Sequence, residues 1–247
     1  MRKYYPECFY ENRRISAIYD AFPGAIWNGR QSNFVGNLYS VEDLEILKQE
    51  LESLNISINL TWNNNLIQGT DIYDKFCNVI TNVFHNGKHS ITVASLDLYN
   101  YLKEKYPNYT YYQSAILGSK DMEFIQHSEF DMYVLNRTLN NDWDKLLQIP
   151  QELRQRIELL CNDSCTPFCN RAYHYNLDNQ FILNRENPPD YISNYCSIDH
   201  DFINFNNERW PITIKSSDID TYITHGFTNF KLCSRGDPTS IMILKTI

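Results

Sequence analysis

The stretch Ile157–Tyr175, which reads IELLCNDSCTPFCNRAYHY, indicates how the whole chain is organised. It opens with a short apolar run, and a run of this length between polar segments is typical of a buried strand. Three cysteines lie within nine residues, and two of them follow the expected strand. In an α/β protein the carboxyl ends of the strands are where ligands bind. The stretch therefore predicts a buried strand that delivers thiols to a functional edge.

The rest of the chain alternates strand-like runs with helix-length amphipathic segments. The expected strands cover residues 14–22, 56–62, 89–94, 109–116, 131–136, 156–161, 210–215 and 227–232. The expected helices cover residues 41–54, 71–83, 96–106, 120–127, 141–149 and 216–226. Ser40 and Asp43 match the capping box that starts a helix. Alternating strands and helices of these lengths imply parallel pairing.

Eight such strands predict a TIM-type (β/α)8 barrel whose last helix is short or missing. We expect residues 1–247 to form this single barrel domain, with an irregular insertion at 169–207 that covers its carboxyl-terminal mouth. An open doubly wound sheet is the alternative. Against it, residues 22–29 read FPGAIWNG and lack the glycine-rich phosphate turn of that fold.

Composition restricts the class of protein and its partners. The chain has 247 residues, 43% of them hydrophobic, which is enough to bury a full core. The formal net charge is −8 and the basic residues are scattered, so we do not expect nucleic acid as a partner. No apolar run approaches the roughly 20 residues of a membrane span. Seven cysteines without an apolar leader favour a reducing compartment, and we expect the cytoplasm.

The cysteines divide into two groups. Cys8 and Cys77 are interpreted as ordinary buried residues, and Cys161 lies within the strand. Strand alternation puts Glu158 and Leu160 on one face and Cys161 on the other, so Cys161 is expected to point away from the site. Four thiols remain as candidate metal ligands, namely Cys165, Cys169, Cys196 and Cys233. This set suits an iron-sulfur cluster or structural zinc, and cysteines without a metal are the remaining alternative.

Several segments resemble the collagenase-like peptidase family, in order along nearly the whole chain. Asn63 follows the second strand where the family has an asparagine, and Gln113 in YYQSA matches the glutamine of a Ser-Thr-Gln-Ala run. The segment VLNRTLN resembles Val-Leu-Ala-Arg-Glu-Leu-Ser, which places Arg137 on the family arginine. ELLCNDSC resembles the family segment that ends in its first cysteine, which falls on Cys165, and Cys169 lies near the second.

The two ends of the chain extend the resemblance. Arg30 precedes an acidic helix start as a family arginine does. The segment FTNFKLCSR is similar to Phe-Lys-Ile-Glu-Gly-Arg, so that Lys231 and Arg235 coincide. Two departures matter. Asn162 or Asp163 replaces a family histidine, and Cys233 stands where peptidase-annotated members have glutamate. The second departure favours the iron-sulfur branch, whose members serve oxygen-independent hydroxylation of ubiquinone and of transfer-RNA uridine.

The resemblance implies a four-iron four-sulfur (4Fe-4S) cluster on the four remaining cysteines and a hydroxylation without molecular oxygen. The substrate or oxygen donor would be a small anion such as prephenate, or a carrier-bound molecule. Arg30, Asn63, Gln113 and Lys231 are the implied substrate-binding residues. Arg137, Asn162, His174 and Arg235 are the implied catalytic residues.

Two other functions stay open. A cysteine-type, peptidase-like hydrolase would pair Cys165 with His174 as nucleophile and base. A non-catalytic, metal-binding partner subunit would work in a hetero- or homodimer, as cluster-binding members of the family do.

Overall fold

The structure, a computed structural model, describes residues 14–29, 39–117, 129–162, 171–186 and 213–232. Within them the chain forms one sheet of seven parallel strands in the order β1-β2-β3-β4-β5-β6-β7. The strands are β1 (Ala17–Asp20), β2 (Ser57–Trp62), β3 (Ser90–Val93), β4 (Thr110–Gln113), β5 (Met132–Val134), β6 (Ile157–Leu160) and β7 (Asn229–Lys231). Each strand pairs with the next along the chain, so successive right-handed crossovers place the helices on one face of the sheet.

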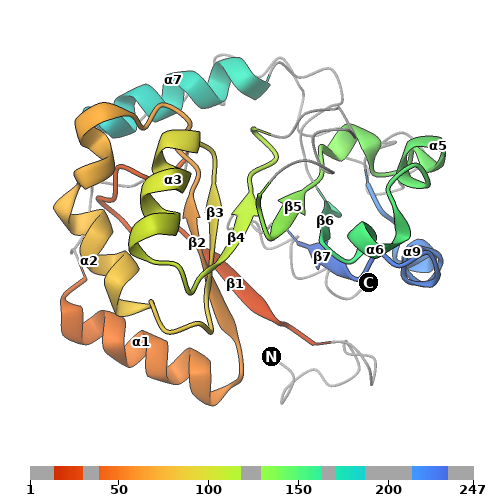
Figure 1. The fold of residues 1–247 in the computed structure, drawn as a ribbon, viewed down its shortest axis with the longest axis horizontal. Helices are drawn as coiled ribbons and strands as arrows, with labels where there is room; N and C mark the ends of the chain where they lie inside the picture. The colour runs from red at the N-terminus through yellow and green to blue at the C-terminus, as the bar shows by residue number, and fades with distance from the viewer. Residues whose placement is uncertain (1–13, 30–38, 118–128, 163–170, 187–212, 233–247) are drawn as a thin grey trace, which may run out of the picture.

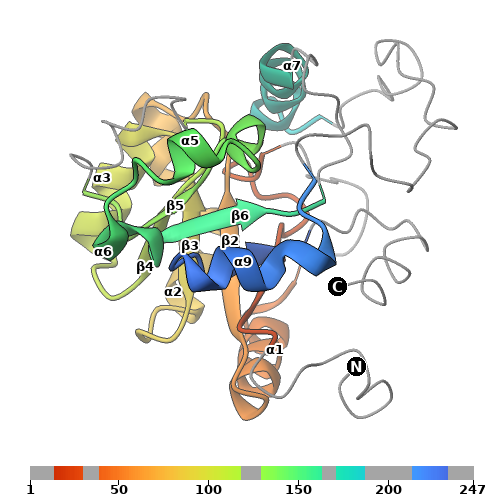
Figure 2. The same ribbon diagram turned by 90° about the vertical axis from the view of Figure 1, so that its right-hand side faces the viewer.

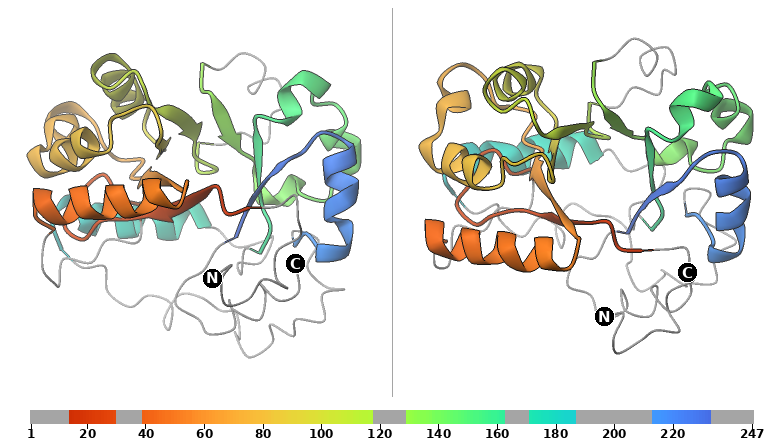
Figure 3. Two further views of the ribbon diagram at one scale, coloured as in Figure 1. Left: turned by 90° about the horizontal axis from the view of Figure 1, so that it is seen from below. Right: turned by 60° about the horizontal axis from the view of Figure 1, so that its bottom comes forward.

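Most of the helices cover the outer face of this sheet. They are α1 (Val41–Ser53), α2 (Lys75–Val83), α3 (Leu96–Lys105), α5 (Trp143–Leu146), α6 (Gln151–Arg154) and α9 (Ile219–Thr224), with 3-10 turns η2 (Gly69–Tyr73), η3 (Arg137–Leu139) and η5 (Ser216–Asp218). Helix α7 (Arg171–Leu183) lies instead across the carboxyl-terminal edge (Figure 1). Helices α1 to α3 lie beside the first strands, whereas α5, α6 and α9 gather around β6 and β7 (Figures 1 and 2). The sheet between them is strongly curled (Figure 3).

Local sequence explains where the main helices begin. Ser40 and Asp43 form the expected capping box, in which the Ser40 hydroxyl accepts from the Asp43 N–H at 3.1 Å and Asp43 accepts from the Ser40 N–H at 2.9 Å. Asp74 caps α2 and Ser95 caps α3 with their side chains alone, which accept from the N–H groups of Cys77 and Leu98. The helix expected from residue 71 therefore starts at Lys75, after the 3-10 turn η2.

The hydrophobic core lies between the sheet and its helices. Alternate residues of the strands point into it, including Leu60, Val93 and Leu159. Trp27, from the loop after β1, packs edge-on against Trp62 with ring centroids 5.6 Å apart. Strands β2 to β6 therefore have an outer face that belongs to the core and an inner face that does not.

Three differences separate the expected fold from the observed one. Residues 213–215, within the seventh expected strand, are not a strand; Ile214 N–H only donates to the Cys161 carbonyl at 3.0 Å. The described chain thus forms a curled α/β sheet of seven strands, and the closed eight-stranded barrel is not seen in these ranges. Part of the segment expected to be irregular, 169–207, forms helix α7, and α6 was not expected.

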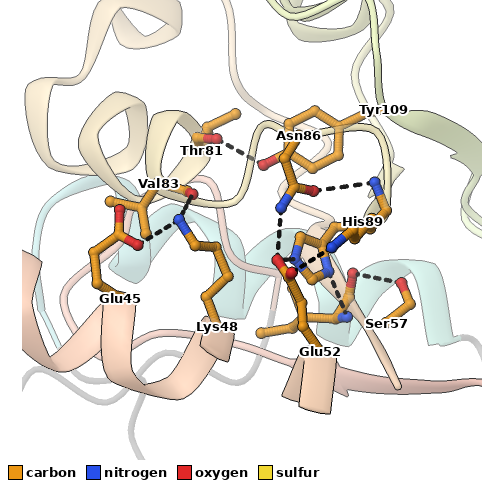
Figure 4. A network of polar contacts seen from close by, with 11 residues as sticks. Glu45, Lys48, Glu52, Ser57, Thr81, Val83, Asn86, His89 and Tyr109 are labelled. Carbon is orange, nitrogen blue, oxygen red and sulfur yellow. Dashed lines mark hydrogen bonds and ion pairs between the residues drawn. The ribbon is translucent and has the colours of Figure 1, made fainter. Parts of the chain in front are cut away.

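A polar network supports the amino-terminal edge of the sheet (Figure 4). His89 is buried beside β3, and its Nδ1 accepts a hydrogen bond from the Ile58 N–H at 3.2 Å. Its Nε2 lies 3.5 Å from Glu52, which also binds Asn86 and Lys88. Burial lowers the pKa of His89 despite the neighbouring carboxylate. Because Nδ1 accepts, the proton of the neutral imidazole lies on Nε2, which faces Glu52 but makes no hydrogen bond within the described chain.

Among the described helices, none is both long and apolar enough to span a membrane.

Candidate functional site

The inner face of the curled sheet carries many polar side chains, together with the apolar Met132, Val134 and Leu160 of β5 and β6. Strand parity and register place Tyr19, Asn59, Thr61, Ser90, Thr92, Tyr112, Glu158 and Lys231 on it. None of these residues belongs to the hydrophobic core, whereas neighbouring positions on β2, β3, β4 and β6 do. Barrel interiors are usually filled by bulky aliphatic side chains. A buried surface that carries this many polar groups is expensive unless the groups bind one another or a ligand.

Three of these side chains meet where the two edge strands approach each other, and we call Tyr19, Glu158 and Lys231 the seam group. The Tyr19 hydroxyl, from β1, donates a hydrogen bond to Oε1 of Glu158 on β6. Lys231 Nζ, from β7, lies 3.4 Å from the centroid of the Tyr19 ring and 3.9 Å from Oε2 of Glu158. The seam group therefore links the first strand to the sixth and seventh by side chains alone.

The electrostatics of the seam group are dominated by burial. Glu158 is only 4% exposed, and this burial raises the pKa of its carboxyl despite the opposing effects of Lys231 and the Tyr19 hydrogen bond. Burial, and secondarily the charge of Glu158, raises the pKa of Tyr112 to about 12. Glu158 Oε2 accepts no hydrogen bond within the described chain. A buried carboxyl with an open oxygen and a raised pKa is suited to proton transfer.

Asn59 adds a second open polar atom to the inner face. It is fully buried on β2 and pairs in register with Tyr19. Its Oδ1 accepts from the Thr92 hydroxyl at 2.7 Å, which orients the amide, and its Nδ2 donates no hydrogen bond within the described residues. An unsatisfied buried donor costs about 1–3 kcal/mol.

The carboxyl-terminal edge is held together by the loops that follow β1 and β2. A Cβ on Gly29 would lie 2.6 Å from the carbonyl oxygen of Asn63, so only glycine permits this approach. The Asn64 N–H donates to the Trp27 carbonyl at 2.9 Å, and the Asn64 side chain also bonds to Asn179 of α7 at 3.3 Å. Helix α7 is thus anchored at the edge where β2 ends.

The expected substrate-binding residues within the described chain occupy different places. Lys231 lies in the seam group. Asn63 follows β2, and its Oδ1 is buried without a hydrogen bond in the described structure. Gln113 is the last residue of β4 and pairs in register with Val93 and Tyr133, which belong to the hydrophobic core. By strand alternation Gln113 therefore lies on the outer face of the sheet, opposite to Tyr112.

The expected catalytic residues are only partly described. Arg137 is buried at the start of η3, directly beyond β5, and Asn162 follows β6 and is half-buried. His174 belongs to α7, and its side chain is not described. Arg30, Cys165, Cys169, Cys196, Cys233 and Arg235 lie outside the described residues.

The two cysteines in the described chain belong to the core, as expected for ordinary buried residues. Cys77 and Cys161 are buried within the hydrophobic core. Cys161 therefore shares the outer face with Leu159, as alternation predicted. Within the described ranges no three His, Cys, Asp or Glu side chains are grouped so as to hold a metal ion.

Sequence reasoning did not assign Tyr19 or Glu158 to the site. For Glu158 the signal was available, because a carboxylate inside an otherwise apolar run, IELLC, is unusual. Tyr19 carries no such signal, since tyrosine is common in strands.

Comparisons with known proteins support the fold alone. No family model matches the chain, and no curated protein matches it. Among solved structures, the U32 peptidase Mk0906 is similar, with a TM-score of 0.55 and 12% sequence identity. The similarity covers 93% of this chain and 97% of that one. The chain thus shares, over nearly its whole length, the overall arrangement of a protein from the collagenase-like peptidase class.

Proposed function

We propose that the protein is an iron-sulfur-dependent enzyme that modifies a small anionic or carrier-bound substrate at the inner face of its curled sheet. One observation carries the proposal. Strands β6 and β7 are parallel neighbours, with Leu160 paired to Lys231 and the Cys161 N–H donating to the Lys231 carbonyl at 2.9 Å. The chain therefore leaves these strands at adjacent points of one edge, and candidate cysteines follow each strand closely in sequence.

The proposed ligands are Cys165 and Cys169 after β6, Cys233 after β7, and Cys196. Four thiolates are the usual ligand set of a 4Fe-4S cluster, and they also suit zinc, which is the alternative metal. A cluster would supply one-electron transfer, as an oxygen-independent hydroxylation needs. We place the protein in the reducing cytoplasm, which keeps cysteine thiols available as metal ligands.

The substrate class follows from the charges near the same edge. Lys231 contributes a positive charge inside the sheet, and Arg137 lies buried just beyond β5. Guanidinium and ammonium groups favour carboxylates, so a small carboxylate or an oxygen donor such as prephenate fits. Arg30 and Arg235 are proposed to add to this charge. A hetero- or homodimer, as in related cluster proteins, completes the proposal.

Anaerobic purification, followed by an absorbance spectrum and by iron and sulfide analysis, tests the metal. We expect a coloured protein with about four irons per chain, which is the content of one 4Fe-4S cluster. Serine replacement of each proposed ligand should remove the iron. The matched controls C77S and C161S should keep it, because both thiols lie in the core. A colourless, iron-free protein after anaerobic reconstitution overturns the proposal, and zinc in its place indicates a structural site.

A further inference from the structure

The dipeptide Asn-Gly occurs twice in the chain, at residues 28–29 and 86–87, in opposite surroundings. Asn28 is fully buried and donates from Nδ2 to the Phe22 carbonyl, and Gly29 packs against the backbone of the loop after β2. Asn86 and Gly87 are both exposed, in the short turn between α2 and β3 (Figure 4). The same pair is therefore sealed in the core at one place and open to water at the other.

The exposed turn brings together the groups that react in deamidation. The backbone nitrogen after an asparagine is able to attack the side-chain amide carbon, and glycine hinders this attack least because it has no Cβ. The Gly87 N–H donates no hydrogen bond within the described chain, so its nitrogen is not held elsewhere. Asn86 Oδ1 accepts from the Lys88 N–H at 3.0 Å. A donor at this oxygen stabilises the negative charge that develops on it during the attack.

We propose that Asn86 is a site of spontaneous deamidation, which converts it to aspartate or isoaspartate and weakens the network around Glu52. The Gly87 nitrogen forms a bond with Cγ of Asn86 and loses its proton to water, and the side-chain nitrogen leaves as ammonia. Water then opens the succinimide ring at either of its two carbonyls. The net reaction consumes one water and releases one ammonia, so no oxidant or reductant is needed.

The amide that would be lost holds a carboxylate. Asn86 Nδ2 donates to Oε1 of Glu52 at 2.6 Å, and the same oxygen lies 3.5 Å from Nε2 of buried His89 (Figure 4). The reaction replaces this donor by a second carboxylate, and two carboxylates at this distance repel each other. Lys88 remains on the other oxygen of Glu52. Deamidation therefore destabilises the contact between the end of α1 and the turn before β3.

This turn lies at the amino-terminal edge of the sheet, whereas the proposed cluster lies beyond the carboxyl ends of β6 and β7. Failure of the cluster proposal would therefore leave the proposed modification intact. The converse also holds.

Peptide mass spectrometry after incubation at mildly alkaline pH tests the reaction, because the attacking backbone nitrogen must lose its proton. We expect Asn86 to deamidate at least tenfold faster than Asn28 in the folded protein, since Asn28 reacts only after local opening. In concentrated urea the two pairs should react at similar rates. Asn82, which is exposed but precedes the branched Val83, is the internal control and should keep its amide.

Urea unfolding tests the consequence. N86D imitates one product and should lower the urea midpoint, as should the deamidated fraction of the aged wild type. The midpoint should fall less when N86D is combined with E52Q, because the facing carboxylate is then absent. N82D is the matched exposed control and should have a midpoint close to that of the wild type.

Two results overturn the proposal. The first is an Asn86 that keeps its amide in the folded protein while both pairs react in urea. The second is an N86D protein with the urea midpoint of the wild type, which would show that the amide does not support Glu52.

Discussion

The ammonium group of Lys231 lies 3.4 Å from the centroid of the Tyr19 ring, which joins the last described strand to the first. These strands share no backbone hydrogen bonds in the described sheet, whose order runs from β1 to β7. The curl of the sheet brings their side chains together around Glu158 (Figure 3). A buried acid, a base and an aromatic ring therefore occupy the point where the sheet comes nearest to closing.

Removal of the Tyr19 hydroxyl should raise the pKa of Glu158 further. Y19F keeps the ring beneath Lys231 but leaves Oε1 of a buried carboxylate without its donor. Carbon-13 NMR of labelled glutamate carboxyls measures the pKa, with E158Q used to assign the signal. The loss of the hydrogen bond should also cost about 1–3 kcal/mol of unfolding free energy. An unchanged pKa would show that the tyrosine does not support the ionised carboxyl in solution.

Replacement of Glu158 by glutamine should alter how stability depends on pH. The pKa of Glu158 is raised in the folded protein, so the folded state binds its proton more tightly than the unfolded state does. Wild-type stability therefore falls as pH rises from the ordinary glutamate pKa through the raised one. E158Q lacks this loss, so its stability relative to the wild type should improve across that window. Urea unfolding at a series of pH values measures this difference, and a constant difference contradicts the prediction.

His89 should make the protein sensitive to acid. Burial lowers its pKa, so the unfolded chain binds a proton that the folded chain resists. The contribution of neutral His89 to the free energy of unfolding should be fully present above the pKa of histidine in the unfolded chain, about 6.5. This contribution should decline as the pH falls below that value. The lowered pKa of Glu52, which arises mainly from its hydrogen bond to Lys88, adds a further loss at lower pH.

The variant H89Q tests this assignment. Thermal unfolding between pH 7.5 and 5 should show a shallower decline than in the wild type, because glutamine does not titrate. H225Q, at the end of α9 and outside the network, serves as the control and should keep the wild-type decline. Equal declines in the wild type and in H89Q would assign the acid sensitivity to other groups.

Substitution of Gly29 by alanine should separate the loops that follow β1 and β2. The new Cβ would lie 2.6–2.7 Å from backbone atoms of Asn63, which side-chain rotation does not relieve. Overpacking of this kind typically costs about 1–3 kcal/mol. Urea unfolding measures the loss, with G69N as the control. Gly69 has open space and a φ of +55°, a conformation that asparagine tolerates. A G29A protein as stable as the wild type would mean that these loops move apart easily.

The sequence by itself determined the local elements and the faces of the strands. The capping box of Ser40 and Asp43, the end of the last helix before Gly226, and the alternation of Glu158 with Cys161 are all confirmed. These features depend on residues a few positions apart, so propensity and periodicity are sufficient to predict them.

Only the tertiary structure decided which residues meet. Tyr19 and Glu158 are 139 positions apart, and their contact depends on the curl that accumulates over seven strands. The strand count and helix α7 also differed from expectation, because pairing partners and packing surfaces, rather than local propensity, determine whether short segments become strands or helices. Periodicity predicts the face on which a side chain lies, but the approach of two distant strands follows from the geometry of the whole sheet.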